Sequence, residues 1–333
     1  MNKASCALLF LIIAAGAPPS IAAESTPRMQ VVQLAGDQVS IRRNGVELTR
    51  LNFGKSLPRP FLFPVIGPSG NPLTRKSGNG EAHHNSIWLG HHNINGIDFW
   101  TNPPGDSGGG GRIVQVQLEN LAGSGTSASV TTLNHWIAAA SGETLLIERR
   151  RHAVQLLDKG EWMLLVDSQF KAVTDVTFDK IPDGFLGVQM VEPISVRADA
   201  TYLPGSSLTS NGNIDEDGLL TKPAKWVDYT GPATSDAEAP VEGIAIFDHP
   251  RNPNHPSLFK VRKSGWMCTS FSGAGPVKLP KGGILRLRYG VYVHGNQPAA
   301  AMEARWQDFA KTEMDNLTPP PAKWSQAGAV LPR

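Results

Sequence analysis

The sequence predicts an all-β protein, a large antiparallel sandwich with one C-terminal helix. Short segments in which apolar and polar residues alternate recur along most of the chain, which is the pattern of half-buried strands. The 34 glycines and 26 prolines, with only 18% charged residues, indicate many turns and few long helices. No alternation of strand and helix patterns occurs, so a dinucleotide-binding fold is not expected.

The strand patterns follow one another with short turns between them. Arg43-Asn44-Gly45, Gly142-Glu143 and Lys159-Gly160 have the composition of hairpin turns. Only residues 298–314 place apolar side chains near helical spacing. The predicted strands are 29–34, 38–41, 46–49, 61–66, 113–118, 128–139, 143–157, 161–172, 173–178, 187–190, 195–197, 226–229, 243–247, 258–262 and 284–293.

The first residues have the features of a secretory signal peptide. Lys3 precedes an apolar run at 7–15, and small residues follow up to Ala23. We therefore expect residues 1–23 to be removed and the protein to be periplasmic or secreted. We expect 24–316 to form a single β-sandwich domain, and 317–333 to be a Pro-rich tail. No other apolar run approaches the ~18 residues of a membrane-spanning helix.

Charge and cysteine content narrow the function classes. The net charge of +2 gives no electrostatic reason to expect nucleic acid as a partner. Without Cys6 of the signal peptide, Cys268 is the only cysteine, so no internal disulfide forms and stability must come from core burial. Cys268 lies between Trp266 and Phe271, which predicts a buried side chain rather than a nucleophile.

A histidine-rich stretch at 81–100 is the strongest chemical signal. Histidine suits both proton transfer near neutral pH and metal ligation. In extended chain, neighbouring residues point to opposite sides, so at most one histidine of each adjacent pair faces a given site. Three interpretations follow: a two-histidine site such as His83 or His84 with His91; a metal site completed by Asp98, Glu148 or His249; or packed loop histidines. The four histidines of the stretch are His83, His84, His91 and His92.

Two further patterns can carry proton transfer. Asp248-His249 ends a predicted strand, and there a carboxylate can orient an imidazole, or Asp248 can simply cap an Asx-turn. Alternation places Glu148, Arg150 and His152 on one face of a strand, where they line a cleft or pair across strands. Residues 213–218 imitate the start of a calcium loop, but Ala224 stands where a bidentate Glu is needed, so a solvated acidic turn is preferred.

Four sequence blocks, which together cover roughly residues 60–270, carry a family resemblance. The blocks are FLFPVIGPSGNPLTR at 61–75, HHNSIWLGHHNINGIDFW at 83–100, WVDYTG at 226–231 and GIAIFDHPRNP at 243–253. Together they resemble the bacterial PmoA-like family, whose function is unknown. Asn85 and His92 depart from the family pattern, which has Arg and Gly there. The resemblance implies a galactose-mutarotase-like β-supersandwich, the fold of sugar epimerases and some polysaccharide lyases.

Together these signals predict an exported carbohydrate-active enzyme, a hydrolase, lyase or epimerase, with its site in a sandwich cleft roofed by residues 71–111. A non-catalytic glycan-binding protein and a metal-dependent enzyme with histidine ligands remain alternatives. No cofactor is identified, and the oligomeric state is not determined. The predicted catalytic residues are His84, His91, Glu148, Asp248 and His249. The predicted substrate-binding residues are His83, Trp88, His92, Asp98, Trp100 and Arg262, with both tryptophans offering their faces to a sugar ring.

Overall fold

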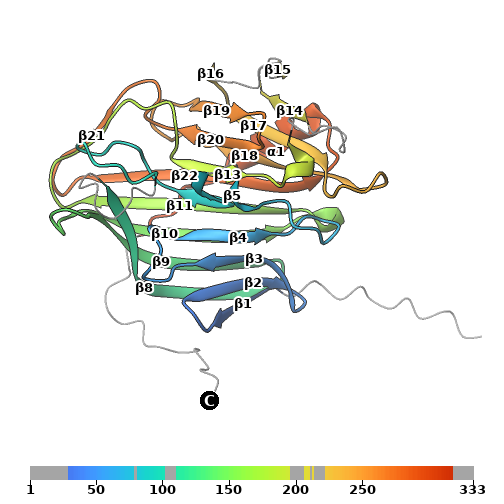
Figure 1. Cartoon of the computed structure of the whole chain (residues 1–333), viewed down its shortest axis with the longest axis horizontal. Helices are drawn as coiled ribbons and strands as arrows, with labels where there is room; N and C mark the ends of the chain where they lie inside the picture. Colours follow the sequence, from blue (N-terminus) through green and yellow to red (C-terminus); the bar gives the residue numbers. More distant parts are fainter. Residues whose placement is uncertain are drawn as a thin grey trace, which may run out of the picture.

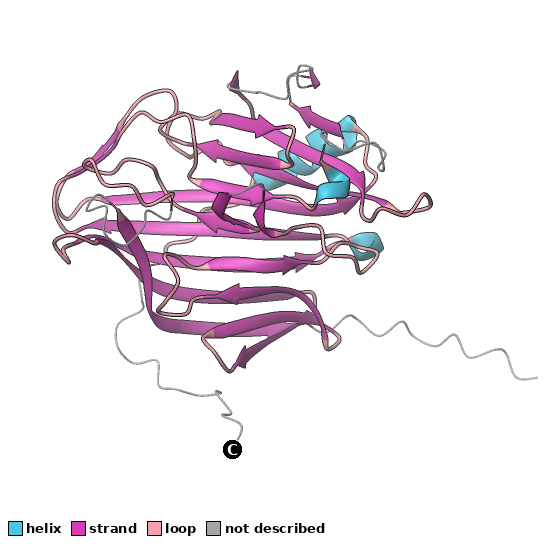
Figure 2. Ribbon diagram, viewed as in Figure 1, coloured by secondary structure: helices cyan, strands magenta, loops and turns pink. Residues whose placement is uncertain are grey.

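Two nine-stranded sheets make up most of the chain. The computed structural model describes residues 29–78, 81–101, 110–195, 206–210, 212–213 and 222–317. Figures 1 and 2 show the strands of the two sheets running along one another in two layers. All strand pairs within both sheets are antiparallel, as the hairpin turns predict.

We call the sheets I and II. In spatial order, sheet I contains β1 (Met29–Leu34), β2 (Gln38–Arg43), β3 (Val46–Asn52), β4 (Phe61–Val65), β7 (Ile87–Leu89), β13 (Leu186–Gln189), β20 (Trp266–Ser270), β19 (Leu258–Arg262) and β16 (Lys222–Pro223). Sheet II contains β15 (Gly212–Asn213), β14 (Ser206–Thr209), β17 (Trp226–Pro232), β18 (Val241–Asp248), β22 (Ile284–Gly295), β11 (Trp162–Ala172), β10 (Thr144–Leu156), β9 (Ser127–Ala138) and β8 (Gly111–Ser124).

Smaller elements complete the described chain. Two small sheets pair β5 (Lys76–Gly78) with β6 (Glu81–Asn85) and β12 (Val176–Phe178) with β21 (Val277–Leu279). Two 3₁₀ turns lie at Asp158–Gly160 and Glu192–Ile194. The helix α1 (Ala299–Ala310) follows β22.

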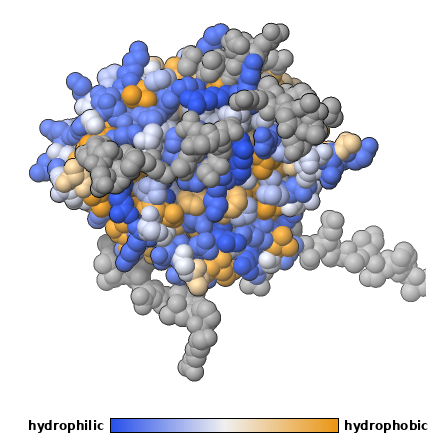
Figure 3. Space-filling model, in the orientation of Figure 1, coloured by the Kyte–Doolittle hydropathy of each residue, from blue (hydrophilic) through white to orange (hydrophobic). Residues whose placement is uncertain are grey.

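The main core lies between the two sheets. It takes alternate residues from strands of both, for example Val39 and Ile41 of sheet I and Leu146 and Val154 of sheet II. The outer face of sheet II is covered in part by α1, where Met302 and Phe309 pack with Phe247 and other residues of the sheet. On the face that Figure 1 presents, hydrophobic residues appear in small groups among hydrophilic ones (Figure 3). The all-β sandwich with one C-terminal helix is therefore confirmed.

The hairpin turns form as their composition predicts. Asn44 and Gly45 between β2 and β3 have φ values of 50° and 82°. Positive φ at both central residues matches the right-handed twist of the flanking strands, and Asn-Gly is the pair that adopts it most readily. Lys159 and Gly160, between β10 and β11, have φ values of 55° and 81°.

Some boundaries differ from the predicted ones. Residues 71–111 are not a single loop, because they contain β5, β6 and β7. The helix ends at Ala310 rather than near 314, because the Thr312 hydroxyl donates to Phe309 O at 2.7 Å and the chain then runs across sheet II. The predicted signal peptide, nearly all of the Pro-rich tail and most of the acidic turn at 213–218 lie outside the described residues. None of the described helices is long and apolar enough to cross a membrane.

Candidate functional site

The histidine-rich stretch divides its side chains between two faces of sheet I. β7 is extended, so odd and even positions point to opposite sides. The same parity extends into the segments that flank it. Ile87, Leu89, His91 and Phe99 point toward the space between the sheets. His84, Trp88, His92 and Trp100 meet on the outer face.

Aromatic rings hold the outer-face residues together. The ring centroids of Trp88 and Trp100 are 5.0 Å apart. His84 stacks on Trp88 at 5.2 Å, and on Trp266 of β20 at 5.3 Å with an 8° interplanar angle. His92 lies 5.7 Å from Trp100 at the other end. We call these five residues the outer cluster, a row with one histidine at each end.

A glycine of β13 allows the tryptophans to lie this close to the sheet. A Cβ at Gly187 would be 2.7 Å from the Trp88 ring and 2.9 Å from the Trp100 ring. Neither ring can retreat, since each packs against other rings of the outer cluster. Gly187 is therefore a packing requirement of the site.

His84 is held neutral at physiological pH. Its pKa is lowered to about 3, first by burial and then by the nearby charges of His83, Arg262 and Arg75. A hydrogen bond with the Gln189 side chain opposes this shift only in part. A neutral imidazole has one nitrogen with a lone pair, so His84 can accept a hydrogen bond.

His92 lies between two carboxylates on the rim of the outer cluster. Its Nδ1 is 3.7 Å from Asp98 Oδ1, and its Nε2 is 4.0 Å from Asp183 Oδ2. Its side chain is 25% exposed, so solvent and small molecules can reach it. Asp183 also pairs with Lys260 of β19 at 2.6 Å. The rim thus joins an imidazole, two carboxylates and an ammonium group.

Asp98 both faces His92 and fixes the backbone beside it. Burial alone would raise the pKa of Asp98, but the nearby His92 imidazole and hydrogen bonds from Thr101 and the backbone at Trp100 lower it to about 2. Its Oδ1 accepts from Trp100 N at 2.7 Å and from Thr101 N at 3.1 Å. Asp98 therefore remains a carboxylate and holds Trp100 in place.

The tryptophan faces are covered. Trp88 and Trp100 are 0% and 1% exposed, so neither offers an open ring face in this arrangement. The groups at the surface are instead those of the rim, together with Arg262, whose guanidinium lies 4.8 Å from the Trp266 ring centroid. His83 is half-buried beside His84, with ring centroids 4.4 Å apart. The tryptophans form the base that carries these polar groups.

His91 lies on the other side of sheet I. It is fully buried, its Nε2 is 2.8 Å from Ser272 Oγ, and its Nδ1 accepts from Asn93 N at 3.1 Å. Its ring packs against Phe178 and Phe271 of the main core. Burial lowers its pKa to about 3. The predicted pairing of His84 with His91 does not form, because the parity of the strand separates them.

Glu148 is engaged between the sheets. Its carboxylate accepts two hydrogen bonds from Arg150, at 2.8 and 2.7 Å, and others from Trp136 Nε1 at 2.8 Å and Ser168 Oγ at 2.7 Å. Glu148 and Arg150 are 0% and 1% exposed, and His152 is buried on the same face. We call these five residues the interior cluster. The sequence predicted that these residues either line a cleft or form ion pairs. The structure shows an ion pair between Glu148 and Arg150, and it does not line an open cleft.

The predicted Asp248–His249 dyad is wrong, because both ring nitrogens of His249 and both carboxylate oxygens of Asp248 contact other groups. Asp248 Oδ2 accepts from His255 Nδ1 and from Ser257 N, both at 2.7 Å, and Oδ1 accepts from Asn252 Nδ2 at 2.8 Å. Asp248 therefore closes the loop after β18 and orients His255. His255 follows that sequence block by two residues, and its position in the loop was the signal for this contact.

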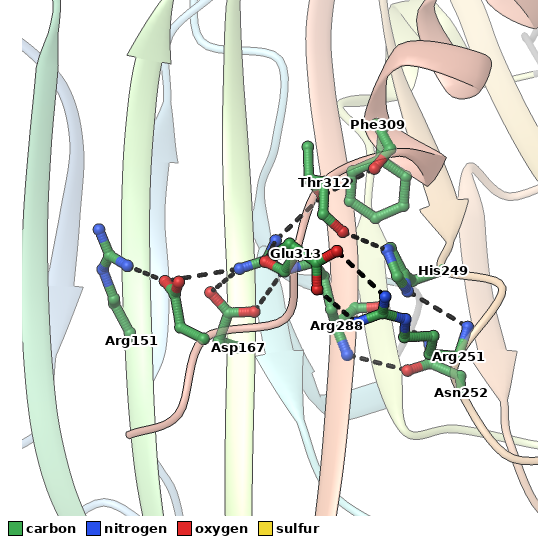
Figure 4. Close-up of polar contacts among 10 residues, drawn as sticks. Arg151, Asp167, His249, Arg251, Asn252, Arg288, Phe309, Thr312 and Glu313 are labelled. Carbon is green, nitrogen blue, oxygen red and sulfur yellow. Dashed lines mark hydrogen bonds and ion pairs between the residues drawn. The ribbon is translucent and has the colours of Figure 1, made fainter. Parts of the chain in front are cut away.

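His249 instead faces α1 and the segment that follows it (Figure 4). Its ring packs on Phe309 at 5.4 Å, and its Nε2 is 3.0 Å from Thr312 O. The same segment is held by Arg288, which donates to Thr312 Oγ1 at 2.9 Å and pairs with Asp167, and by Arg251, which pairs with Glu313 at 2.6 Å. His249 is thus part of the attachment of the chain end to sheet II.

Several residues of the site were not predicted from the sequence. Gln189, Trp266, Lys260 and Asp183 come from strands or loops distant in sequence. The spacing of Lys260 and Arg262 on one strand was a signal that both share a face, but nothing local places that face beside residues 83–100. Among the described residues, no group of three His, Cys, Asp or Glu side chains could hold a metal ion.

Comparison with known proteins assigns the chain to a family of unknown function. A family described as "Family of unknown function (DUF6807)" matches residues 38–307. No PmoA-like family matches, so that part of the resemblance stays a prediction. No curated protein matches the chain.

Among solved structures, the chain is similar to sugar-acting proteins at low identity. A mutant of heparan sulfate lyase HepC from Pedobacter heparinus matches at 12% identity and TM-score 0.34, over 86% of this chain but 38% of the lyase. The HepC lyase itself matches at 11% and 0.33, over 78% of this chain and 34% of the lyase. Galactose 1-epimerase from Lactobacillus acidophilus NCFM matches at 7% and 0.34, over 81% of this chain and 98% of the epimerase.

Proposed function

The chain belongs to this family of unknown function (DUF6807), and we propose that it is an exported enzyme acting on a sugar or glycan by proton transfer at the outer cluster. The observation that carries the proposal is the row of tryptophans with a histidine at each end. One of these histidines is buried and neutral, and the other is partly exposed between two carboxylates.

The two histidines suit different steps. His84 is neutral at physiological pH and can hydrogen-bond a substrate hydroxyl, while its pKa of about 3 makes it a weak base there. His92 exchanges a proton with the substrate, and Asp98 and Asp183 orient its ring. Proton transfer at an anomeric carbon, or at a carbon next to a carboxylate, needs an acid and a base in one site.

The rim supplies the groups that recognise a sugar. Lys260 and Arg262 donate hydrogen bonds to hydroxyl or carboxylate oxygens, and the carboxylates of Asp98 and Asp183 accept them from hydroxyls. The tryptophans act through these side chains, because their own faces are covered. This role differs from the sugar stacking predicted from the sequence.

Hydrolysis, elimination and epimerisation all use such a pair, so the proposal names the substrate class and proton transfer rather than one of these reactions. The signal-like residues 1–23 support a periplasmic or secreted location, where the protein would meet glycans released outside the cell. The structural matches include carbohydrate-active proteins, but with TM-scores of 0.34 they carry no part of the argument, which rests on the site.

The test is turnover of a panel of oligosaccharides, neutral and acidic, by the mature protein. His84→Gln and His92→Gln should each lower kcat by about 10²–10⁴-fold, the usual contribution of general acid–base catalysis. His135→Gln is the matched control, because His135 lies on β9 of the other sheet. Its rate should equal that of wild type.

Two results would contradict the proposal. Sugar binding that both variants retain, with no turnover under any condition, would identify a non-catalytic glycan-binding protein. Turnover that is lost with a chelator and restored by a divalent metal would identify a metal-dependent enzyme.

A further inference from the structure

The loop that follows β18 presents a histidine that a buried carboxylate orients. Asp248 is 0% exposed, and its Oδ2 lies 2.7 Å from His255 Nδ1. The same oxygen accepts from Ser257 N at 2.7 Å. A carboxylate oxygen only accepts, so Nδ1 carries the hydrogen, and in the neutral ring Nε2 carries the lone pair. This is the arrangement in which a carboxylate prepares an imidazole for acid–base chemistry.

The loop itself is held to both sheets. Asn252 Nδ2 donates to Asp248 Oδ1 and to Arg288 O of β22, both at 2.8 Å, and its Oδ1 accepts from Arg288 N at 2.9 Å. Asn254 Nδ2 donates to Phe271 O at 2.9 Å, directly after β20 of sheet I. Reactive side chains need a support that fixes their geometry, and these contacts supply one.

The second ring nitrogen of His255 is open. Within the part of the chain that the structure describes, Nε2 forms no hydrogen bond, and it is not a buried atom. The side chain is 19% exposed. In contrast, His91, His249 and His294 each use both ring nitrogens in polar contacts. Those three histidines are structural, whereas His255 keeps one nitrogen for a ligand.

Trp306 of α1 adds an aromatic ring beside the imidazole. The two rings are nearly parallel, at 4°, with centroids 6.2 Å apart, and the indole N–H donates to Asp248 O at 3.0 Å. Lys225 Nζ lies 4.7 Å from the same indole centroid and pairs with Glu303 at 2.6 Å. The side chains of Lys225 and Glu303 are 34% and 30% exposed. A half-buried aromatic ring with donors and acceptors around it suits a sugar, which has apolar ring faces and hydroxyls.

We propose that Asp248 and His255 form a second proton-transfer site, in which His255 Nε2 takes the proton of a sugar hydroxyl bound beside Trp306. The O–H bond breaks, its electron pair stays on the oxygen, and the imidazolium that forms is paired with the Asp248 carboxylate. His255 is the catalytic residue and Asp248 is a positioning residue. The site shares no residue with the outer cluster or its rim, so it does not depend on the function proposed for them.

The first measurement is carbethoxylation of the native mature protein by diethyl pyrocarbonate, which reacts with an imidazole lone pair. Mass spectrometry of peptides should find an adduct on His255, and a saturating sugar from a panel of neutral and acidic oligosaccharides should abolish it. The fully buried His91, His152 and His294 should stay unmodified, which reports that the protein is folded. A native protein without the adduct would overturn the proposal, as would an adduct that no sugar of the panel prevents.

The second measurement is turnover of the sugars that protect His255. His255→Gln should lower kcat by about 10²–10⁴-fold. His135→Gln, on β9, is the matched control and should leave kcat unchanged. Turnover lost in His255→Gln but retained in His92→Gln would assign the chemistry to this dyad and reject the outer cluster. The reverse result would overturn the dyad and keep the outer cluster, and protection without any turnover would leave a binding site and overturn proton transfer.

The role of Asp248 has its own readout, the tautomer of His255. In wild type labelled with ¹⁵N in histidine, long-range ¹H–¹⁵N correlations at alkaline pH should show Nδ1 protonated and Nε2 with the lone pair. An averaged pattern would overturn the positioning role without any variant. In Asp248→Asn, the side-chain amide can donate to Nδ1, so the lone pair should move toward Nδ1. An unchanged tautomer in the folded variant would show that Asp248 only supports the loop.

Discussion

The interior cluster and the outer cluster are built from similar residues and behave differently. Each joins tryptophan, histidine and charged side chains on strands of the sandwich. In the interior cluster, Glu148 receives hydrogen bonds from Arg150, Trp136 and Ser168, and the ion pair is sealed between the sheets. In the outer cluster, the rim around His92 is reached by solvent.

The difference shows that burial on a given face decides what a polar side chain does. A charged pair sealed between two sheets must be fully hydrogen-bonded, because its desolvation costs several kcal/mol. Such a pair has no capacity left for a substrate. A half-exposed group keeps that capacity, and its ionic contacts contribute little stability.

The largest effect should come from breaking the interior ion pair. Glu148→Gln leaves the Arg150 guanidinium buried without its countercharge, so we expect a loss of about 3–5 kcal/mol in the free energy of unfolding. Urea unfolding at pH 7.5 measures it. Glu119→Gln is the control, because Glu119 pairs with Arg149 on the outward face of the same strand, and it should cost at most about 1 kcal/mol. Equal losses in both variants would contradict the comparison.

Acid should destabilise the protein through three buried histidines, one in each cluster and His91 in the main core. The pKa values of His84, His91 and His152 are all lowered to about 3, mainly by burial, so these groups stay neutral in the fold while the unfolded chain binds protons below about pH 6.5. Stability is then complete above pH 6.5 and falls toward pH 3, by up to about 1.4 kcal/mol per pH unit for each histidine.

Unfolding by urea between pH 7.5 and pH 5 measures this slope. His294 has the opposite sign, because the Asp228 carboxylate raises its pKa despite burial, and its contribution is lost as the pH rises. His152→Gln should flatten the acid slope of the interior cluster, and His84→Gln that of the outer one. If both variants had the same dependence of unfolding free energy on pH as wild type, these buried histidines would not be the cause of the loss of stability in acid.

Removing the rim histidine should cost little stability. His92 contacts Asp98 and Asp183 at 3.7 and 4.0 Å and is partly exposed. His92→Gln should therefore change the free energy of unfolding by less than about 1 kcal/mol, in contrast to Glu148→Gln. Thermal and urea unfolding measure it. A loss as large as that of Glu148→Gln would place His92 among the structural residues.

The smallest effect concerns the thiol of Cys268, which lies under the outer cluster and should not react in the native protein. Cys268 is fully buried there, and burial raises the pKa of its thiol to about 12. A maleimide at pH 7.5 should leave the native protein unlabelled over minutes and label it fully in urea, as mass spectrometry would show. Rapid labelling of the native protein would mean that the outer cluster opens.

Much of the fold was predictable because strand patterns and turns are local. The alternation in residues 284–293 and the Asn44-Gly45 turn each depend on neighbours in sequence only. The histidine-rich stretch was also recognisable from its composition. The rule that adjacent histidines diverge held for His91 and His92 but not for His83 and His84, whose ring centroids are 4.4 Å apart.

The sequence by itself determined the class of fold, the turn positions and the pairs of residues that cannot share a face, since all of these follow from a two-residue period along the chain. Only the tertiary structure decided which face is sealed and which is open. It set Glu148 between the sheets and brought Gln189, Trp266 and Asp183 beside His84 and His92. Those contacts join strands far apart in sequence, and no local pattern encodes which strands become neighbours.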